Sequence, residues 1–425
     1  MIAKMNGTKP LTLVIKLGTS SIVNENTHET LLPVLSLIVV TVVKLRKDGH
    51  RVVIVSSGAV GLGLQRMGID RRPKHLSRSQ ALAAIGQCRL ISLWDQLFGY
   101  YGQPVAQILL TRNDIADHHN YLNAQNTISE LLEQGVIPII NENDTLAGDG
   151  IKFGDNDTLA AITAAIIHSD LLFLMTDVDC LYTKNPRTNT DAQPIKLVEA
   201  TDSPIADVSS MGSALGTGGM STKVVAAKLA TSAGVTTVIT RSSSPDRIHR
   251  IVQYIQMRKS SFTETQLVNG ARQTRDTTSQ AKVSETSIIQ ELPPHTMFLP
   301  LLQPVRDRNF WLLHGLTPRG TLYIDGGAYC ELVNSAGLLA MHILDVEGPF
   351  GSREAVRLVV MDCKSDQAEG VKSCKATQVE VGRALVNYAA PEISRIKGCR
   401  SDQIEYVLGY MDSCYVADGS NISLF

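Results

Sequence analysis

Short, uniformly apolar runs alternate with longer amphipathic stretches through residues 1–257 of the chain. Runs of this kind predict strands that are buried on both faces, as in a parallel sheet covered by helices. Six of them are expected to be strands, at 12–18, 51–58, 104–111, 135–141, 170–177 and 234–240. Helical spacing occurs near 29–48, 78–100, 121–134, 157–168 and 222–233, and Gly234 stands where a helix C′ residue belongs. This alternation predicts an α/β fold, a mainly parallel sheet sandwiched by helices, whose ligands lie beyond the carboxyl ends of the strands.

The pattern changes after residue 257. Residues 258–309 are rich in Ser, Thr, Gln and Pro without sustained periodicity, and we expect them to be a linker. Residues 310–425 then form a small β-rich domain with one helix. Its short apolar runs are expected to be strands, at 310–316, 320–328, 355–363, 378–388 and 405–410. The polar stretch 363–376 inside this domain is expected to be an exposed loop. The predicted organisation is therefore a domain at 1–257, a linker at 258–309 and a second domain at 310–425.

Composition narrows the class of protein. The formal net charge of −1 over 425 residues provides no basic field for nucleic acid or an anionic membrane. The longest apolar run, 31–43, is well short of the ~20 residues that a membrane span needs, and the first 20 residues do not resemble a secretory signal. Seven cysteines without any CxxC pair fit free thiols in a reducing compartment. These features predict a cytoplasmic protein without a membrane anchor.

Residues 215–223 read LGTGGMSTK and bring glycines, two hydroxyls and a lysine together. A Walker A loop would place the lysine before the hydroxyl residue, so this order excludes that motif. The glycines would let the backbone approach a ligand closely, and residues 221–223 would open a helix whose free N–H groups favour an anion. The same residues also fit a glycine-rich turn with a helix cap, so the motif alone leaves phosphate binding open.

A lysine also ends the first apolar run. Burying Lys16 there is costly unless its ammonium reaches solvent or an anion. Lys16 therefore either extends to the surface or faces the crevice beside the small residues at 18–20 and binds a phosphate. The segment SSGAVGLG at 56–63 is another turn of small residues that suits an anion, and it lacks the G-x-S-x-G pattern of a hydrolase nucleophile.

The densest polar segment is NENDTLAGDGIKFGDNDTLAAITAA at 141–165. Part of it fits an Asx-rich turn and an N-cap, and its spacing is not that of an EF-hand calcium loop. It holds more acid and amide groups than capping needs: Asn141, Glu142, Asn143, Asp144, Asp155, Asn156 and Asp157. Such groups bind an ammonium, such as the α-amine of an amino acid, or organise lysines around a phosphate. Thr176 and Asp177 end another expected strand and either border a nucleotide or form an ordinary connection.

Together these motifs resemble the glutamate 5-kinase family of the amino-acid kinase superfamily. IKLGTS, SSGA, QxLLTR, NENDT, GDND and GTGGMSTK occur in that family's order and approximate spacing over residues 12–257. The domain from 310 looks like the PUA domain that many of these enzymes carry. The resemblance implies ATP-dependent phosphorylation of the γ-carboxylate of L-glutamate, the first step of proline biosynthesis. It implies ATP and Mg²⁺ as cofactors, with the magnesium carried by ATP and no metal ligands in the protein.

The resemblance also implies three sets of site residues. The catalytic residues would be Lys16, Lys223 and Asp157. The residues that contact ATP would be Lys16, Thr176, Asp177, Thr217, Gly218, Gly219, Met220, Ser221, Thr222 and Lys223. The residues that bind glutamate would be Ser57, Asp144 and Asn156. A carboxylate acceptor is already ionised at neutral pH, so the absence of an obvious histidine-centred triad fits this chemistry.

The resemblance further implies inhibition by proline, a homo-oligomer and glutamyl phosphate reductase as a functional partner. Two alternatives stay open: a kinase of the same fold that acts on another amino acid, and an RNA-binding protein that uses the PUA-like domain. Residues 301–425 carry 15 acidic and 12 basic residues, a net charge of −3, which argues against RNA as a partner. A bifunctional synthetase with a fused reductase is not expected, because the residues after the linker are too few and too rich in strands for a reductase domain.

Overall fold

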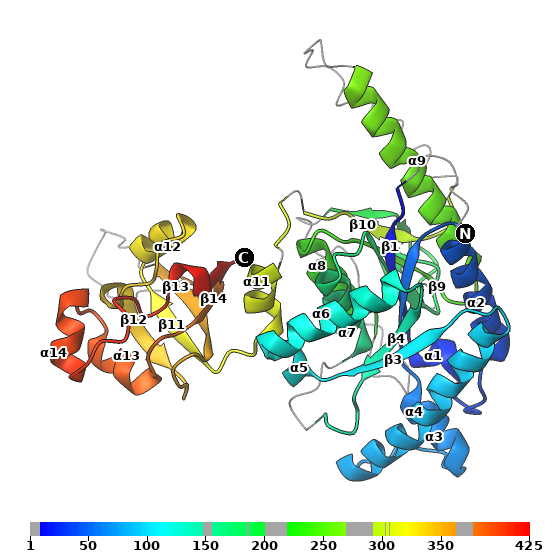
Figure 1. The fold of residues 1–425 in the computed structure, drawn as a ribbon, viewed down its shortest axis with the longest axis horizontal. Helices are drawn as coiled ribbons and strands as arrows, with labels where there is room; N and C mark the ends of the chain where they lie inside the picture. The colour runs from blue at the N-terminus through cyan, green and yellow to red at the C-terminus, as the bar shows by residue number, and fades with distance from the viewer. Residues whose placement is uncertain are drawn as a thin grey trace. The chain divides into compact units, whose positions relative to one another are not determined.

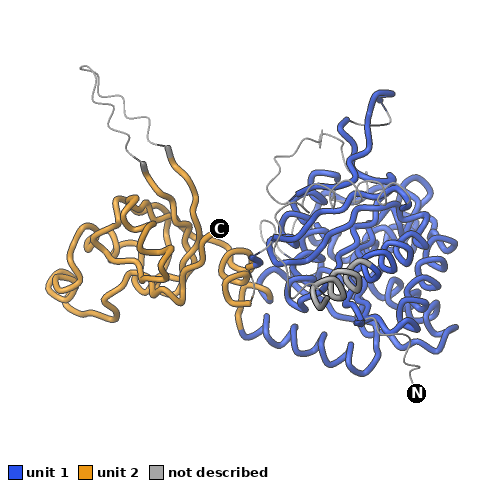
Figure 2. The backbone as a smooth tube through the Cα atoms, turned by 90° about the horizontal axis from the view of Figure 1, so that it is seen from above, with its two compact units in different colours: residues 1–114, 119–304 blue, residues 115–118, 305–425 orange. Residues whose placement is uncertain are grey.

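The structure is a computed structural model, and it describes residues 9–147, 155–184, 186, 188–199, 219–268, 292–301, 303–305, 307–362 and 377–425. The chain divides into two compact units (Figure 2). The first unit comprises residues 1–114 and 119–304, and the second comprises residues 115–118 and 305–425.

The first unit is built on an eight-stranded sheet with the strand order β3-β4-β2-β1-β5-β9-β10-β8 (Figure 1). Its strands are β1 (Thr12–Leu17), β2 (Arg51–Ser56), β3 (Val105–Leu110), β4 (Ile137–Glu142), β5 (Leu171–Thr176), β8 (Leu197–Val198), β9 (Thr236–Arg241) and β10 (Thr296–Phe298). A separate short hairpin pairs β6 (Leu181–Tyr182) with β7 (Pro194–Ile195). The six strands expected from the apolar runs are confirmed, and they pair in parallel with one another.

Helices cover both faces of this sheet. They are α1 (Thr19–Ile22), α2 (Leu32–Lys47), α3 (Ala59–Met67), α4 (Leu76–Gly99), α5 (Arg112–Ala116), α6 (His118–Glu133), α7 (Asn156–Ile166), α8 (Met220–Ser232) and α9 (Asp246–Val268). Leu13, Ile15 and Leu17 of β1 belong to a core that includes buried side chains of α2, α4 and α9. Side chains alternate along a strand, so Lys16 points to the opposite face. That face is covered by α7, which contacts β1, β2, β4 and β5 and packs against α8.

Two glycines bring α3 and α4 into close contact. A Cβ atom on Gly86 would lie 1.7 Å from the carbonyl oxygen of Ala59, and one on Gly63 would lie 2.1 Å from that of Leu82. Any larger residue at these two positions would push the helices apart, because backbone atoms cannot move aside as flexible side chains can. The glycines therefore fix the position of α4 relative to α3, which begins directly after Ser57 and Gly58.

Secondary structure extends into the stretch 258–309 that was expected to be a linker. Helix α9 runs to Val268, and Thr296–Phe298 forms β10, which pairs antiparallel with β9. A three-residue strand is too short to show a period in the sequence, which explains why it was missed. The predicted end of α8 is confirmed: the helix ends at Ser232, and Gly234 has a φ of 85° in the left-handed region.

The second unit contains a five-stranded sheet with the strand order β12-β11-β13-β14-β15. Its strands are β11 (Gly320–Ile324), β12 (Ile343–Glu347), β13 (Ala355–Asp362), β14 (Thr377–Leu385) and β15 (Ile422–Leu424). Its α-helices are α11 (Asp307–Phe310), α12 (Gly326–Val333), α13 (Ala390–Ile396) and α14 (Ile404–Leu408). Buried side chains of the strands, such as Leu322 and Leu358, pack with Ile393 and Ile404 of the helices.

Two predicted strands of this unit are wrong, and so is the prediction of a single helix. Residues 310–315 are helical, because α11 continues into a π-helical turn at Trp311–Gly315. Residues 405–408 belong to α14, which ends at Gly409 with a φ of 85°. A short apolar run cannot by itself distinguish a strand from a buried helical turn. The predicted exposed loop at 363–376 lies outside the described residues. In the part of the chain that is described, no helix is both long and apolar enough to span a membrane.

Candidate active site

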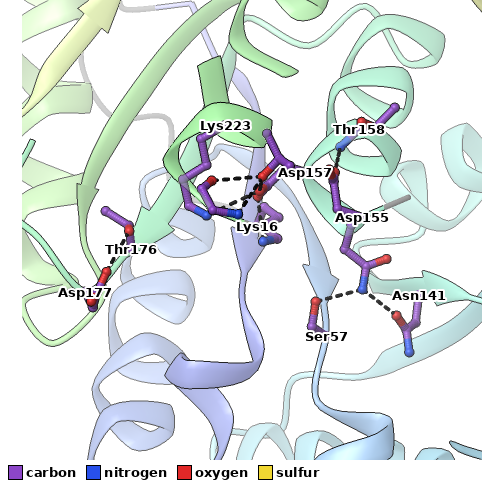
Figure 3. A network of polar contacts seen from close by, with 12 residues as sticks. Lys16, Ser57, Asn141, Asp155, Asp157, Thr158, Thr176, Asp177 and Lys223 are labelled. Carbon is purple, nitrogen blue, oxygen red and sulfur yellow. Dashed lines mark hydrogen bonds and ion pairs between the residues drawn. The ribbon is translucent and has the colours of Figure 1, made fainter. Parts of the chain in front are cut away.

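Three charged side chains from three elements meet at the carboxyl end of β1 (Figure 3). The Nζ atom of Lys16 lies 2.5 Å from Oδ1 of Asp157, and the Nζ atom of Lys223 lies 3.2 Å from Oδ2 of the same carboxylate. Asp157 is the second residue of α7, and Lys223 lies in the first turn of α8. The side chain of Asp157 has no exposed surface, and those of Lys16 and Lys223 are 4% and 9% exposed. The structure thus brings together the three residues predicted to be catalytic.

The charges of this cluster do not cancel. Burial alone would raise the pKa of Asp157, but the cations of Lys16 and Lys223 outweigh it and lower the pKa to about 2. Burial, and then repulsion from Lys16, lowers the pKa of Lys223. Two cations therefore share one buried carboxylate, so these three side chains together carry one more positive than negative charge, while the carboxylate of Asp155 acts on the lysines from outside this contact. An anion that binds beside the lysines would relieve their repulsion.

The two acids of the polar segment 155–158 have different roles. The Asp155 carboxylate accepts a hydrogen bond from the backbone N–H of Thr158 at 2.7 Å and caps α7. The pKa of Asp155 is raised, and burial is the main cause. Asp157 takes no part in the cap and faces the lysines. The alternatives of capping and charge organisation are therefore both realised, by two residues that are two positions apart.

The first turn of α8 joins the same cluster. The hydroxyl of Thr222 donates to Oδ2 of Asp157 at 2.9 Å and accepts from the backbone N–H of Gly219 at 3.0 Å. Ser221 is exposed and Met220 is half-buried. Helix α8 thus presents the free N–H groups of its N-terminus beside two lysines, an arrangement that suits a phosphate. Thr217 and Gly218, which were predicted to contact ATP, lie outside the described residues.

A chain of neutral polar side chains lies beside the charged cluster (Figure 3). Nδ2 of Asn156 donates to Oγ of Ser57 at 2.7 Å and to Oδ1 of Asn141 at 2.9 Å. Nδ2 of Asn141 in turn donates to Oε1 of Gln87 on α4 at 2.8 Å. The structure thus brings together Ser57 and Asn156, two of the residues predicted to bind glutamate. Asp144, the third, is half-buried in the turn after β4.

Sequence reasoning missed the role of Gln87 in this chain. A glutamine on an amphipathic helix gives no signal of its own, and its partner Asn141 lies 54 positions away on β4. Asn141 was recognised as part of the polar segment but was not assigned to a ligand. Its side chain is 2% exposed, so its partners are fixed by the fold.

The ends of β5 and β9 carry a further polar group. The hydroxyl of Thr176 donates to Oδ1 of Asp177 at 3.1 Å. Two positions on, Asp179 pairs with Nη2 of Arg241 at 3.1 Å and with Nη1 of Arg247 at 2.7 Å. Because β5 is adjacent and parallel to β1, Thr176 lies at the same edge of the sheet as Lys16. The pairing of Asp179 with two arginines was not predicted.

The donor set at the centre of the site suits an anion better than a bare metal ion. Among the described residues, no group of three or more His, Cys, Asp or Glu side chains is arranged to hold a metal. Asp157, the carboxylate between the lysines, is already paired with both of them. The side chains in contact here are thus two ammonium groups and one carboxylate, which suits an anion such as a phosphate.

Known families match both units. The amino acid kinase family matches residues 12–241, and the PUA domain matches residues 320–408. The "Probable glutamate 5-kinase" of Schizosaccharomyces pombe is 50% identical over 412 residues, which cover 96% of this chain and 92% of the relative. The glutamate 5-kinase of a Cyanothece species is 41% identical over 415 residues, which cover 97% of this chain and 99% of the relative. That of a Synechocystis species is 41% identical over 419 residues and covers 98% of each chain.

The chain therefore belongs to the amino acid kinase family and, at this identity and coverage, to its glutamate 5-kinase branch. It is a kinase, and its second unit carries a PUA domain. The resemblance inferred from the motifs is confirmed.

Proposed function

We propose that this kinase transfers the γ-phosphoryl group of ATP to the γ-carboxylate of L-glutamate, giving γ-glutamyl phosphate and ADP as the first step of proline biosynthesis. The observation that carries the proposal is the buried Lys16–Asp157–Lys223 cluster, with its excess of positive charge, in a chain whose relatives are glutamate 5-kinases. The substrate follows from those relatives, and the site supplies a chemical reason for it.

The acceptor carboxylate needs no general base, because its ordinary pKa of about 4.3 leaves it ionised at neutral pH. What the reaction requires is the approach of two anions, the carboxylate and the γ-phosphate. Lys16 and Lys223 come from different elements and would hold the transferring group from two sides. Asp157 would keep both ammonium groups in place. Magnesium bound with ATP would neutralise charge between the β- and γ-phosphates.

The other roles follow the same geometry. Thr176 and Asp177 at the end of β5, with residues 217–223 before and within α8, would contact ATP. Ser57, Asn156 and Asp144 would bind the amino-acid end of glutamate, where a zwitterion offers one ammonium and one carboxylate. The charged cluster and the amide chain would thus serve the two substrates separately.

A hydroxamate assay tests the proposal, because hydroxylamine traps an acyl phosphate. The purified enzyme with Mg-ATP should form hydroxamate from glutamate and much less from aspartate or N-acetylglutamate. Glutamate-independent turnover, or an equal rate with aspartate, would overturn the assignment. The same assay with added proline tests inhibition. Proline shares the α-amino-acid end of glutamate, and we propose that it competes at Asp144 and Asn156.

The product is an acyl phosphate that hydrolyses in water, so we propose that glutamyl phosphate reductase consumes it in the cytoplasm, and that the kinase acts as a homo-oligomer. Sedimentation of the purified enzyme tests the oligomer. Pathway flux that is the same with both enzymes concentrated or dilute would argue against direct transfer of the product.

A further inference from the structure

The chain of hydrogen bonds from Ser57 to Gln87 has a direction. At its far end the carbonyl oxygen of Gln87 accepts from the amide nitrogen of Asn141 at 2.8 Å. The carbonyl oxygen of Asn141 then accepts from the amide nitrogen of Asn156 at 2.9 Å, and the same nitrogen donates to the Ser57 hydroxyl at 2.7 Å. Asn156 therefore donates both of its bonds, to Ser57 and to Asn141, and Asn141 donates the third bond, to Gln87.

This direction decides what the near end of the chain offers a ligand. Both hydrogens of the Asn156 amide are used within the chain. Its oxygen Oδ1 is buried and has no hydrogen-bond partner among the residues that the structure describes. In its bond with Asn156 the oxygen of Ser57 accepts, so its own hydrogen remains for another acceptor. The chain thus presents one acceptor, Asn156 Oδ1, and one donor, the Ser57 hydroxyl, which is the complement of an ammonium and a carboxylate.

Turning the amide of Asn141 over would reverse these properties. Its nitrogen would then face the nitrogen of Asn156, so Asn156 would have to turn as well and present its N–H groups to an incoming ammonium. Ser57 would lose its free hydrogen to the oxygen of Asn156. The nitrogen of Asn141 needs an acceptor and finds the oxygen of Gln87, so the chain as a whole reverses only if the amide of Gln87 turns together with those of Asn141 and Asn156.

The fold holds Gln87 in place for this contact. Gln87 is half-buried and follows Gly86, the residue at which the backbone of α4 meets the carbonyl of Ala59 on α3. Helix α3 itself begins two positions after Ser57. Both ends of the hydrogen-bonded chain are therefore tied to the same contact between α3 and α4.

We propose that Gln87 is a positioning residue that holds Asn141, and with it the Ser57–Asn156–Asn141 chain, in the orientation described above, and thereby maintains the affinity for the amino-acid substrate. The inference rests on the proposed function, in which this chain binds the ammonium and carboxylate of glutamate. Gln87 acts through Asn141 and touches no substrate. Its effect is expected on the KM of glutamate, because Gln87 lies on α4, whereas Lys16, Asp157 and Lys223 of the charged cluster lie on β1, α7 and α8.

The experiment compares three variants in the hydroxamate assay. Gln87→Met keeps the length of the side chain and removes the acceptor of Asn141. The amides of Asn141 and Asn156 are then free to turn, and the ammonium of glutamate loses its acceptor on Asn156. The KM of glutamate should rise about 10- to 100-fold, the size expected when a hydrogen bond to a charged group is lost. The kcat and the KM of ATP should stay near those of the wild type. Gln87→Glu keeps an acceptor oxygen and should largely restore the KM. Gln125→Met is the matched control, because Gln125 is also half-buried and also bonds through its side chain, at 2.6 Å to the carbonyl of Ile166.

The outcomes separate the inference from the proposed function. A wild type without glutamate-dependent turnover would reject both. A Gln87→Met enzyme with the wild-type KM, or a Gln87→Glu enzyme as impaired as Gln87→Met, would reject the role of Gln87 alone. If Gln87→Met fails to fold, Gln87→Lys takes its place: it can only donate, so it should force the reversed chain and raise the KM, and an unchanged KM would again reject the role.

Discussion

Each unit shields a titratable side chain from water, but the buried Asp157 of the first unit stays ionised, whereas the half-buried His314 of the second unit is held neutral. Asp157 lies within 3.2 Å of two ammonium groups, which lower its pKa to about 2 in spite of its burial. His314 packs against the rings of Phe310 and Phe425, with ring centroids 4.9 and 6.4 Å away. Burial, and then repulsion from Arg383, lowers its pKa to about 4.

The difference between Asp157 and His314 shows which of the two units keeps a charged side chain away from water. A buried ion is costly unless it is paired. The second unit avoids the cost by keeping its histidine uncharged, as expected where packing is the only demand. The first unit pairs its carboxylate with two cations, and the unpaired excess makes that cluster suited to an anionic ligand.

The largest effect is expected for Asp157→Asn. Removing the carboxylate leaves two buried cations without compensation, which should lower the free energy of unfolding of the first unit by about 3–5 kcal/mol. The chain has two tryptophans, Trp94 in the first unit and Trp311 in the second. Urea unfolding followed by Trp94 fluorescence in a Trp311→Phe background therefore reports the first unit alone.

Asp191→Asn provides the matched control for that measurement. Asp191 also pairs with a lysine, Lys184, at 2.6 Å, but both side chains are exposed. Its removal should leave the unfolding curve unchanged, because exposed pairs contribute little. Equal unfolding curves for the two variants would contradict the claim that burial makes the Asp157 cluster special.

The next largest effect is expected for Lys223→Ala. Loss of a charge aimed at the transferring group should lower kcat by about 10²–10³, while the KM of glutamate is retained. Lys228→Ala is the control on the same helix, because Lys228 is exposed. A near-normal kcat in the purified Lys223→Ala enzyme would remove this lysine from the chemical step and leave the cluster a structural role only.

A smaller effect, in the second unit, is expected from acid. The pKa of His314 in the folded state, about 4, lies below its ordinary value of 6.5. The stabilisation from keeping it neutral is therefore complete above pH 6.5 and is lost as the pH falls through 4. That loss should amount to about 3 kcal/mol. The corresponding contribution of Asp157, whose pKa falls from 3.8 to about 2, is complete above pH 3.8 and is lost only as the pH falls through 2.

Trp311 fluorescence in a Trp94→Phe background measures this effect of acid. The stability of the second unit should fall less between pH 7 and 4 in His314→Phe than in the parent protein, because phenylalanine keeps the ring packing and cannot titrate. If the stability of the two proteins depended on pH in the same way, titration of His314 would not contribute to the loss of stability in acid.

The same contrast explains how much the sequence could predict. A lysine in an otherwise apolar strand is conspicuous because burial of charge needs a reason, and Lys16 indeed meets Asp157. The parallel strands of the first unit could be predicted because each is a continuous apolar run between turn residues. In the second unit, the apolar run 310–316 carries no such unambiguous period, and its residues 310–315 are helical.

What could not be predicted depends on contacts between distant residues. Gln87 and Asn141 are 54 positions apart, and nothing in the local sequence of either points to the other. Asp179 likewise meets Arg241 and Arg247 only because β5 and β9 are neighbours in the sheet. The neutral bond between Asn141 and Gln87 involves no costly isolated charge, so it leaves no signal in composition or periodicity.

The smallest effect is expected for Asp144→Ala, which tests a carboxylate proposed to meet the ligand directly. Loss of an ionic hydrogen bond to the ammonium of glutamate should raise the KM of glutamate about 10- to 100-fold. The contact is made equally in the ground state and the transition state, so kcat should change little. Asp144→Asn keeps the oxygen and loses the charge, and its KM should fall between those of the wild type and Asp144→Ala. Thr145→Ala, an exposed neighbour in the same turn, should leave the KM unchanged. If Asp144→Ala lowered kcat at constant KM, Asp144 would belong with the charged cluster rather than with the binding of the amino acid.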